Sequence, residues 1–86
     1  MYYTYVLFSK KDKNFYIGFT SNLRIRINKH KNGKVYSTKN RLPIILIFYE
    51  AYLNKFDALR REKYLKTTKG RTTLKSMLRE FLKSIF

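Results

Sequence analysis

Hydrophobic and polar positions alternate in short segments along the first half of the chain, and each segment predicts one strand or helix. Residues 2–8 are aromatic and β-branched without a breaker, which is typical of a β-strand. A polar turn over residues 10–14 leads into a second strand over residues 15–19, so the two strands form a hairpin. We then expect a helix over residues 22–31, for which Thr20-Ser21-Asn22 offers caps and which Asn32-Gly33 ends.

The second half of the chain predicts one more strand and two helices. Residues 44–50 are apolar on both faces of the predicted strand, so we place this strand in the middle of the sheet or deep within it. A helix is expected over residues 54–66, closed by residues 67–70, and a last helix with an apolar face over residues 72–83. The predicted fold is α+β: a small, three-stranded, mostly antiparallel sheet flanked by helices in the order β-β-α-β-α-α.

The length and composition of the chain narrow its class. With 86 residues, we expect a single domain over residues 1–86. The absence of cysteine excludes disulfides and thiolate metal sites. The longest apolar run, residues 42–49, is far shorter than the roughly 20 residues needed to span a bilayer, and the first residues do not resemble a signal peptide. We therefore expect a cytoplasmic protein that does not enter a membrane.

Charge is the strongest compositional signal. Twenty Lys and Arg residues face five Asp and Glu residues, a formal net charge of +15. Such a field favours a polyanionic partner, nucleic acid first, with solubility alone as the simpler explanation. In the basic connection of residues 34–41, we expect Lys34, Lys39 and Arg41 to bind nucleic acid.

Among the few carboxylates, Glu62 has the most unusual predicted position. By helical spacing it shares a face with Ala58, Leu59 and Leu65. An acid among apolar neighbours is destabilising unless it is paired or bound to an ion. Glu62 is therefore a candidate metal ligand, and an ion pair with a neighbouring Lys or Arg is the alternative from its position alone.

The first helix carries two polar residues on its apolar stripe. Leu23, Arg26, Ile27 and His30 recur at helical spacing. Arg26 and His30 are one turn apart and could converge on one anion, as a phosphate clamp would. The alternatives are a solvated basic face and, for His30, a cation suited to the helix end. His30 is the only histidine, so a histidine metal cluster is excluded.

Tyrosines form the third candidate group. Tyr3, Tyr5 and Leu7 share one face of the first strand, and Tyr16 and Gly18 share a face of the second. The short turn should bring Tyr5 roughly opposite Tyr16, where two phenols could orient a water or accept a proton from it. Cross-strand aromatic packing is the alternative, and Gly18 would let a backbone or a ligand approach closely.

Taken together, these segments resemble the GIY-YIG nuclease family, including its small stand-alone bacterial members. Tyr3-Thr4-Tyr5 stands where the family has Gly-Ile-Tyr, and Tyr16-Ile17-Gly18 is an unaltered second half. Arg26, His30 and Glu62 follow in the family's order, and the likeness runs from about Tyr2 to Lys66. Tyr3 replaces the first glycine, and no asparagine follows the glutamate as it does in many larger members.

The resemblance implies an endonuclease that hydrolyses phosphodiester bonds in nucleic acid, with DNA favoured over RNA. It implies that Tyr5 orients or deprotonates the attacking water with Tyr16 as its partner, and that Arg26 stabilises charge on the phosphate. Glu62 would bind one Mg²⁺ or Mn²⁺ ion, and His30 would have an accessory role. A nucleic-acid-binding module without catalysis is the main alternative, a structural or ribosome-associated basic protein is a third, and the oligomeric state is left open.

Overall fold

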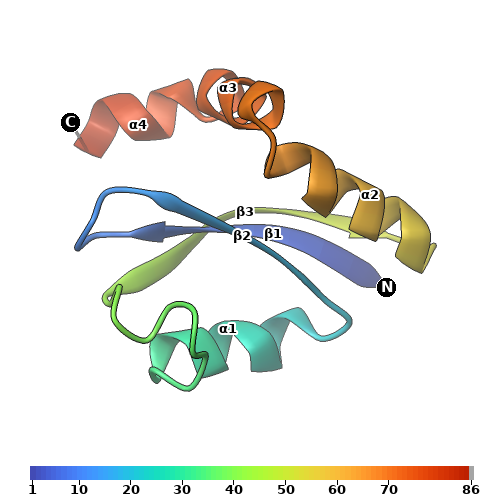
Figure 1. Ribbon diagram of the computed structural model, residues 1–86, viewed down its shortest axis with the longest axis horizontal. Helices are drawn as coiled ribbons and strands as arrows, with labels where there is room; N and C mark the ends of the chain where they lie inside the picture. The colour runs from blue at the N-terminus through green and yellow to red at the C-terminus, as the bar shows by residue number, and fades with distance from the viewer. Residues whose placement is uncertain (86) are drawn as a thin grey trace.

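The computed structural model describes residues 1–85, which form an antiparallel sheet with helices on both faces (Figure 1). The strands are β1 (Tyr2–Ser9), β2 (Phe15–Thr20) and β3 (Ile44–Tyr52), in the spatial order β2-β1-β3. The helices are α1 (Leu23–Lys31) on one face and α2 (Lys55–Leu65), α3 (Thr68–Met77) and α4 (Arg79–Ile85) on the other. The predicted α+β class and order are thus confirmed, with one helix more than expected.

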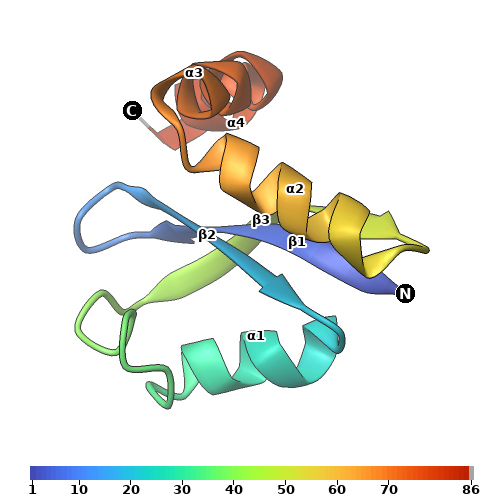
Figure 2. The ribbon, with the colours of Figure 1, turned by 45° about the vertical axis from the view of Figure 1, so that its right-hand side comes forward.

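The central strand is β1, and the prediction that residues 44–50 lie in the middle of the sheet is wrong. Val6 of β1 pairs with Ile17 of β2 on one side and with Phe48 of β3 on the other. The edge strand β3 is nevertheless apolar on both faces, because helices cover both faces of the sheet. Figure 2 shows β3 in the same layer as β1, between α1 and α2.

Alternating side chains of β1 divide the interior into two cores. Val6 and Phe8 point into the larger core, which includes Leu65 of α2 and Leu74 of α3. The smaller core lies under α1 and contains Tyr5, Leu7, Ile27 and Ile44. A polar-ended side chain, Tyr5, therefore stands in the middle of the core that α1 covers.

Helix α3 begins earlier than predicted, and the sequence 67–70 is its first turn rather than a closing loop. Thr67 is the N-cap, because its Oγ1 accepts the Gly70 N–H at 3.0 Å. The helix ends at Leu78, and α4 follows directly, so the single helix predicted over residues 72–83 is two. Both pack their apolar side chains on the larger core. Within residues 1–85, no helix has the length and apolar character needed to cross a bilayer.

Replacing Gly70 by alanine should destabilise the fold although alanine is the better helix former by up to about 1 kcal/mol. The added methyl group would overlap the carbonyl oxygen of Tyr64 and lie 2.6 Å from Cα of Leu65. These are backbone atoms that cannot rotate away, so we expect the free energy of unfolding to fall by about 1–3 kcal/mol. Urea denaturation measures it, with Ser76→Ala on the exposed side of α3 as the control. A Gly70→Ala protein as stable as wild type would contradict this packing.

Candidate active site

Tyr5 lies at the centre of β1, and its side chain is fully buried. Its partner across the hairpin is Gly18, whereas Tyr16 pairs with Leu7, so the expected opposition of Tyr5 and Tyr16 is wrong by two residues. A methyl group on Gly18 would overlap Cζ and the oxygen of the Tyr5 phenol. The close approach expected at Gly18 is therefore made by this phenol, which lies directly over the backbone of β2.

Two side chains of α1 meet at the Tyr5 hydroxyl. His30 Nε2 lies 2.8 Å from the phenol oxygen, and Arg26 Nε donates to the same oxygen at 3.4 Å. The two residues are one turn apart on the inward stripe that the periodicity predicted, while Ile25 between the turns is exposed. The helix thus presents a guanidinium and an imidazole to one phenol.

His30 is fully buried and hydrogen-bonded through both ring nitrogens. Its Nδ1 lies 2.7 Å from the hydroxyl of Thr38, which is also fully buried. Burial, together with the nearby Arg26 guanidinium, lowers the pKa of His30 to about 4. The ring is therefore neutral at pH 7, which excludes the alternative of a helix-end cation.

A neutral imidazole donates through one nitrogen and accepts through the other, so two arrangements satisfy both bonds. In one, Nδ1–H donates to Thr38 and Nε2 accepts the proton of Tyr5. In the other, Thr38 donates to Nδ1 and Nε2–H donates to Tyr5. Either way the buried groups are paired, and none of the buried side-chain nitrogen or oxygen atoms described in the structure lacks a partner.

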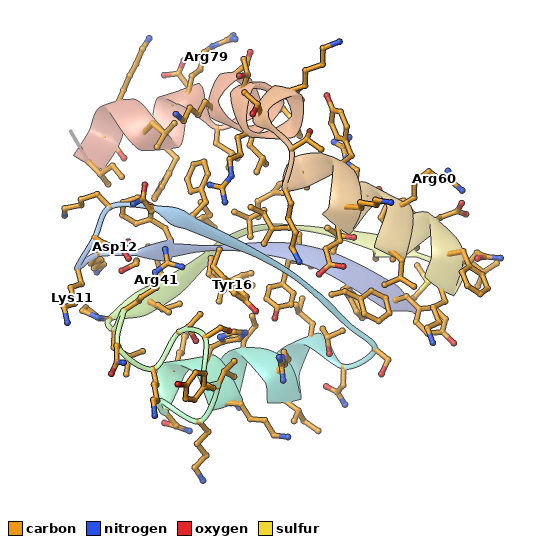
Figure 3. The ribbon with its side chains drawn as sticks, viewed as in Figure 1. Lys11, Asp12, Tyr16, Arg41, Arg60 and Arg79 are labelled. Carbon is orange, nitrogen blue, oxygen red and sulfur yellow. The ribbon has the colours of Figure 1, made fainter. Side chains whose placement is uncertain are left out.

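Tyr16 lies diagonally across from Tyr5, with ring centroids 6.5 Å apart. Its ring is closer to that of His30, at 5.2 Å in an edge-to-face arrangement. Figure 3 shows that Tyr16 points from β2 toward the side on which α1 lies. The Ser37 hydroxyl donates to the Tyr16 oxygen at 3.2 Å, so this phenol is also held by the chain that follows α1.

Glu62 lies on α2, which covers the face of the sheet opposite α1, and it is not among the side chains that contact the Tyr5 hydroxyl. The Thr4 hydroxyl, next to Tyr5 in β1, donates to the carbonyl oxygen of Ala58 at 2.6 Å in a buried contact. Glu62 follows Ala58 by one turn, and its side chain is only 20% exposed. The Glu62 carboxylate forms an ion pair with Lys66 at 3.1 Å, which was the alternative to a metal ligand from its position in the sequence. Its negative charge also raises the pKa of the Tyr5 phenol.

The surroundings of Tyr5 keep its phenol protonated at neutral pH. Burial raises the pKa of Tyr5 above its usual value, and the charges of Tyr16 and Glu62 raise it further, whereas the Arg26 hydrogen bond lowers it. Burial is the largest of these effects. The cation that a tyrosine base would need is present, but it does not offset the desolvation, so Tyr5 is a neutral hydrogen-bonding group.

The three basic residues predicted to bind nucleic acid lie in the α1–β3 loop (residues 32–43). Lys34 and Lys39 are exposed. Arg41 is instead held in a bidentate contact with Asp12 of the hairpin turn, at 2.6 and 3.2 Å, and this contact lowers the pKa of Asp12 (Figure 3). Arg41 therefore joins the loop to the hairpin as well as adding positive charge.

Sequence reasoning missed Ser37 and Thr38, although they contact Tyr16 and His30. They follow Tyr36 within a basic connection, where Ser and Thr are ordinary loop residues. Neither their spacing nor their charge indicates a functional role. Their partners are distant in sequence, and the contacts depend on the path of the loop.

The residues present suit one hard divalent ion but not a cage. Residues 1–85 contain no cluster of three or more His, Cys, Asp or Glu side chains that could enclose a metal. Mg²⁺ is commonly bound through one or two carboxylates while keeping waters and taking substrate phosphate oxygens. The carboxylate of Glu62 fits that requirement, since it is partly exposed and an oxygen donor.

Comparison with known proteins identifies the family to which this chain is similar. A family model described as the GIY-YIG catalytic domain matches residues 1–75, a range that includes all five predicted site residues. A UPF0213 protein of Staphylococcus haemolyticus is 37% identical over 75 residues, which cover 86% of this chain and 90% of that protein. A UPF0213 protein of Clostridium perfringens is 42% identical over 67 residues, covering 77% and 71%.

A solved structure is similar as well. The solution NMR structure of the UPF0213 protein BH0048 from Bacillus halodurans matches with a TM-score of 0.56 at 33% identity. The match covers 90% of this chain and 85% of that one. The family resemblance inferred from the motifs is thereby confirmed.

Because His30 is buried and neutral, the free energy of unfolding should decrease as the pH is lowered from about 6.5 to about 4. The upper limit is the usual histidine pKa. In this window the unfolded chain binds a proton that the folded chain does not, because the folded pKa is about 4. Stability should therefore fall as the pH decreases. NMR of the single histidine ring measures its pKa directly, and urea denaturation at several pH values measures the slope. A ring that titrates near pH 6.5 in the folded protein would contradict this environment.

Proposed function

We propose that this chain, which belongs to the GIY-YIG family, is a metal-dependent endonuclease. It would hydrolyse phosphodiester bonds in nucleic acid, in DNA rather than RNA. The observation that carries the proposal is the contact of Arg26 and His30 with the Tyr5 hydroxyl, at 3.4 and 2.8 Å. A phenol held between a guanidinium and an imidazole is suited to orienting a water beside a phosphate. A surface that only binds nucleic acid does not require it.

Tyr5 would orient the attacking water through its oxygen. A phenol oxygen can accept two hydrogen bonds and donate one. If Tyr5 donates to Nε2 of His30 and accepts from Arg26, one acceptor position is left for the water. The water would then donate one hydrogen bond to Tyr5 and be oriented for attack, while Tyr5 donates to His30. This direction requires the arrangement in which Nδ1–H of His30 donates to Thr38.

His30 and Tyr16 have supporting roles in this proposal. His30 stays neutral throughout the neutral range because its pKa is about 4, so it can keep the Tyr5 hydroxyl in place as a neutral hydrogen-bond partner. Tyr16 packs against the His30 ring and is held by Ser37 at 3.2 Å, so it can hydrogen-bond the water or the phosphate from a fixed position.

Arg26 would stabilise negative charge that develops on the phosphate oxygens. Its Nε is directed to Tyr5, and the hydrogen bond to that phenol raises the pKa of the guanidinium. The guanidinium has five N–H donors in a planar fork. The remaining donors can therefore contact the phosphate while Nε keeps the phenol in place.

Glu62 is the residue that would hold Mg²⁺ or Mn²⁺. When bound, such an ion polarises the phosphate and stabilises the leaving oxygen. The contribution of the chain itself is to keep one carboxylate near Tyr5, on a helix fixed by the contact between Thr4 and Ala58. Lys66 pairs with this carboxylate and would have to release one of its oxygens.

Positive charge would bring the substrate to this site. Every charged side chain from Ser21 to Tyr49 is Lys or Arg. Lys34 and Lys39 are free to contact phosphates, and Arg41 adds to the field while it is paired with Asp12. Binding through such contacts releases counterions and should weaken as the salt concentration increases.

One observation favours the second candidate, a nucleic-acid-binding protein that does not cleave. The pair between Glu62 and Lys66 satisfies the carboxylate without a metal. The two functions differ in their response to divalent ions, because cleavage requires them and binding through lysines does not.

Replacing Glu62 by glutamine should abolish cleavage and leave the fold intact, since the side chain keeps its size and loses its charge. We expect nicking of plasmid DNA with Mg²⁺ to fall at least about 100-fold, the scale of losing a group that stabilises the transition state. EDTA should stop the wild-type reaction. Equal nicking by the mutant and wild-type proteins would remove Glu62 from the mechanism.

Glu80→Gln is the matched control, because it makes the same charge change at a residue with an 81% exposed side chain on α4. We expect it to cleave like wild type. If both variants lost activity equally, net charge rather than the site would be responsible.

Replacing Arg26 by alanine should reduce turnover more than binding, because its role is in the transition state. We expect kcat to fall about 100- to 1,000-fold, with a small change in the Kd for DNA. Arg24→Ala, an exposed cation on the same helix, is the control for charge. An Arg26→Ala protein with unchanged kcat would exclude the clamp.

A further inference from the structure

We propose that the α1–β3 loop (residues 32–43) carries a nucleobase-stacking platform, with Tyr36 as the stacking side chain, that binds an unpaired nucleotide next to the catalytic site. This inference rests on the proposed function, since it names the class of substrate that the site would receive. It concerns a residue to which the mechanism above assigns no role.

Tyr36 is 84% exposed, more than any other tyrosine or phenylalanine in residues 1–85. Aromatic side chains of the sheet instead pack on one another or on His30, as Tyr2 does on Phe19 and Tyr16 on His30. An aromatic ring that makes no core contact contributes nothing to the hydrophobic stabilisation of the fold. The ring of Tyr36 is therefore open to a partner without any loss to the fold.

The backbone that carries Tyr36 is held in place. Val35 on one side is buried, and Thr38 is fully buried against His30. The N–H groups of Thr38 and Lys39 both donate to the carbonyl oxygen of Val35, at 3.1 and 2.9 Å. The loop thus presents the ring from a fixed turn, and less conformational entropy is lost when a base stacks on it.

The surroundings of the ring select a polyanion. The Lys39 ammonium lies 4.6 Å from the centroid of the Tyr36 ring, over one face, and Lys34 is exposed in the same loop. The acid that contacts this loop, Asp12, is neutralised by Arg41 at 2.6 Å. A base on the open face of the ring would therefore have a cation close by for its phosphate, and an acidic peptide would lack any use for the ring.

The platform is adjacent to the catalytic groups. Tyr36 points outward, while the next two residues point inward: Ser37 donates to Tyr16 at 3.2 Å and Thr38 contacts His30 at 2.7 Å. Consecutive Cα atoms are about 3.8 Å apart, so the backbone carries Tyr36 within two residues of the contact between Thr38 and His30. A nucleotide stacked on Tyr36 would therefore lie on the same side of the molecule as His30 and Tyr16.

The stacked nucleotide must be unpaired. In a duplex the faces of each base are covered by its neighbours, whereas stacking on a side chain requires an open face. Phosphate contacts from lysines do not make this distinction. The platform should therefore favour single strands, overhangs or flaps over a blunt duplex.

The test is binding in EDTA, where metal-dependent cleavage does not occur. The probes are a labelled single-stranded oligodeoxythymidine of about twelve nucleotides, within the usual range of site sizes, and a blunt duplex of the same length. Tyr36→Ala should weaken single-strand binding about 5- to 150-fold, the equivalent of one stacked base. Binding of the duplex should change less than about twofold, because phosphate contacts dominate it.

Tyr36→Phe keeps the ring and should bind like wild type. Phe56→Ala is the matched control, because Phe56 is another exposed ring, 71% exposed, on the distant helix α2. The fluorescence of 2-aminopurine in a single strand should be quenched when the wild-type protein binds, and not when the Tyr36→Ala protein binds. The proposal is overturned if Tyr36→Ala binds the single strand like wild type, if both probes weaken equally, or if Phe56→Ala has the same effect. None of these outcomes depends on whether Glu62 supports cleavage.

Discussion

A phenol can be buried inside a small sheet only if its oxygen finds hydrogen-bond partners, and here those partners decide where the surrounding elements lie. The Tyr5 oxygen is met by Arg26 and His30, so α1 must present one particular stripe to the sheet. The ring itself fits only because Gly18 has no side chain. The same contacts that fix the fold on this face therefore assemble the proposed catalytic group.

The low dielectric constant around these contacts determines the protonation states of Tyr5 and His30. Burial lowers the pKa of His30 to about 4 and raises that of Tyr5, so that both groups are neutral at pH 7 while Arg26 is charged. A neutral imidazole and a protonated phenol can each donate one hydrogen bond and accept another. The contact between Tyr5 and His30 is thus a neutral hydrogen bond rather than an ion pair. In the proposed function, the charge that balances a phosphate would come from Arg26 and from the basic surface outside.

The α1–β3 loop connects the interior to that surface. Thr38 completes the hydrogen bonding of His30, and Ser37 that of Tyr16, while Arg41 fastens the loop to Asp12. The same turn leaves Tyr36 in solvent. One loop therefore contacts the buried side chains around Tyr5 and also forms part of the solvent-exposed surface.

The sequence by itself determined the class of fold, the approximate starts of α1 and α2, and the inward stripe of α1, because these depend on spacing and on contacts between near neighbours. It also determined the family, since the motif residues keep their order along the chain. Tertiary structure alone decided that β1 rather than β3 is central, that Gly18 rather than Tyr16 faces Tyr5, and that Thr38 reaches His30. Strand order, register and loop path depend on contacts between residues far apart in sequence, and no local pattern encodes those distances.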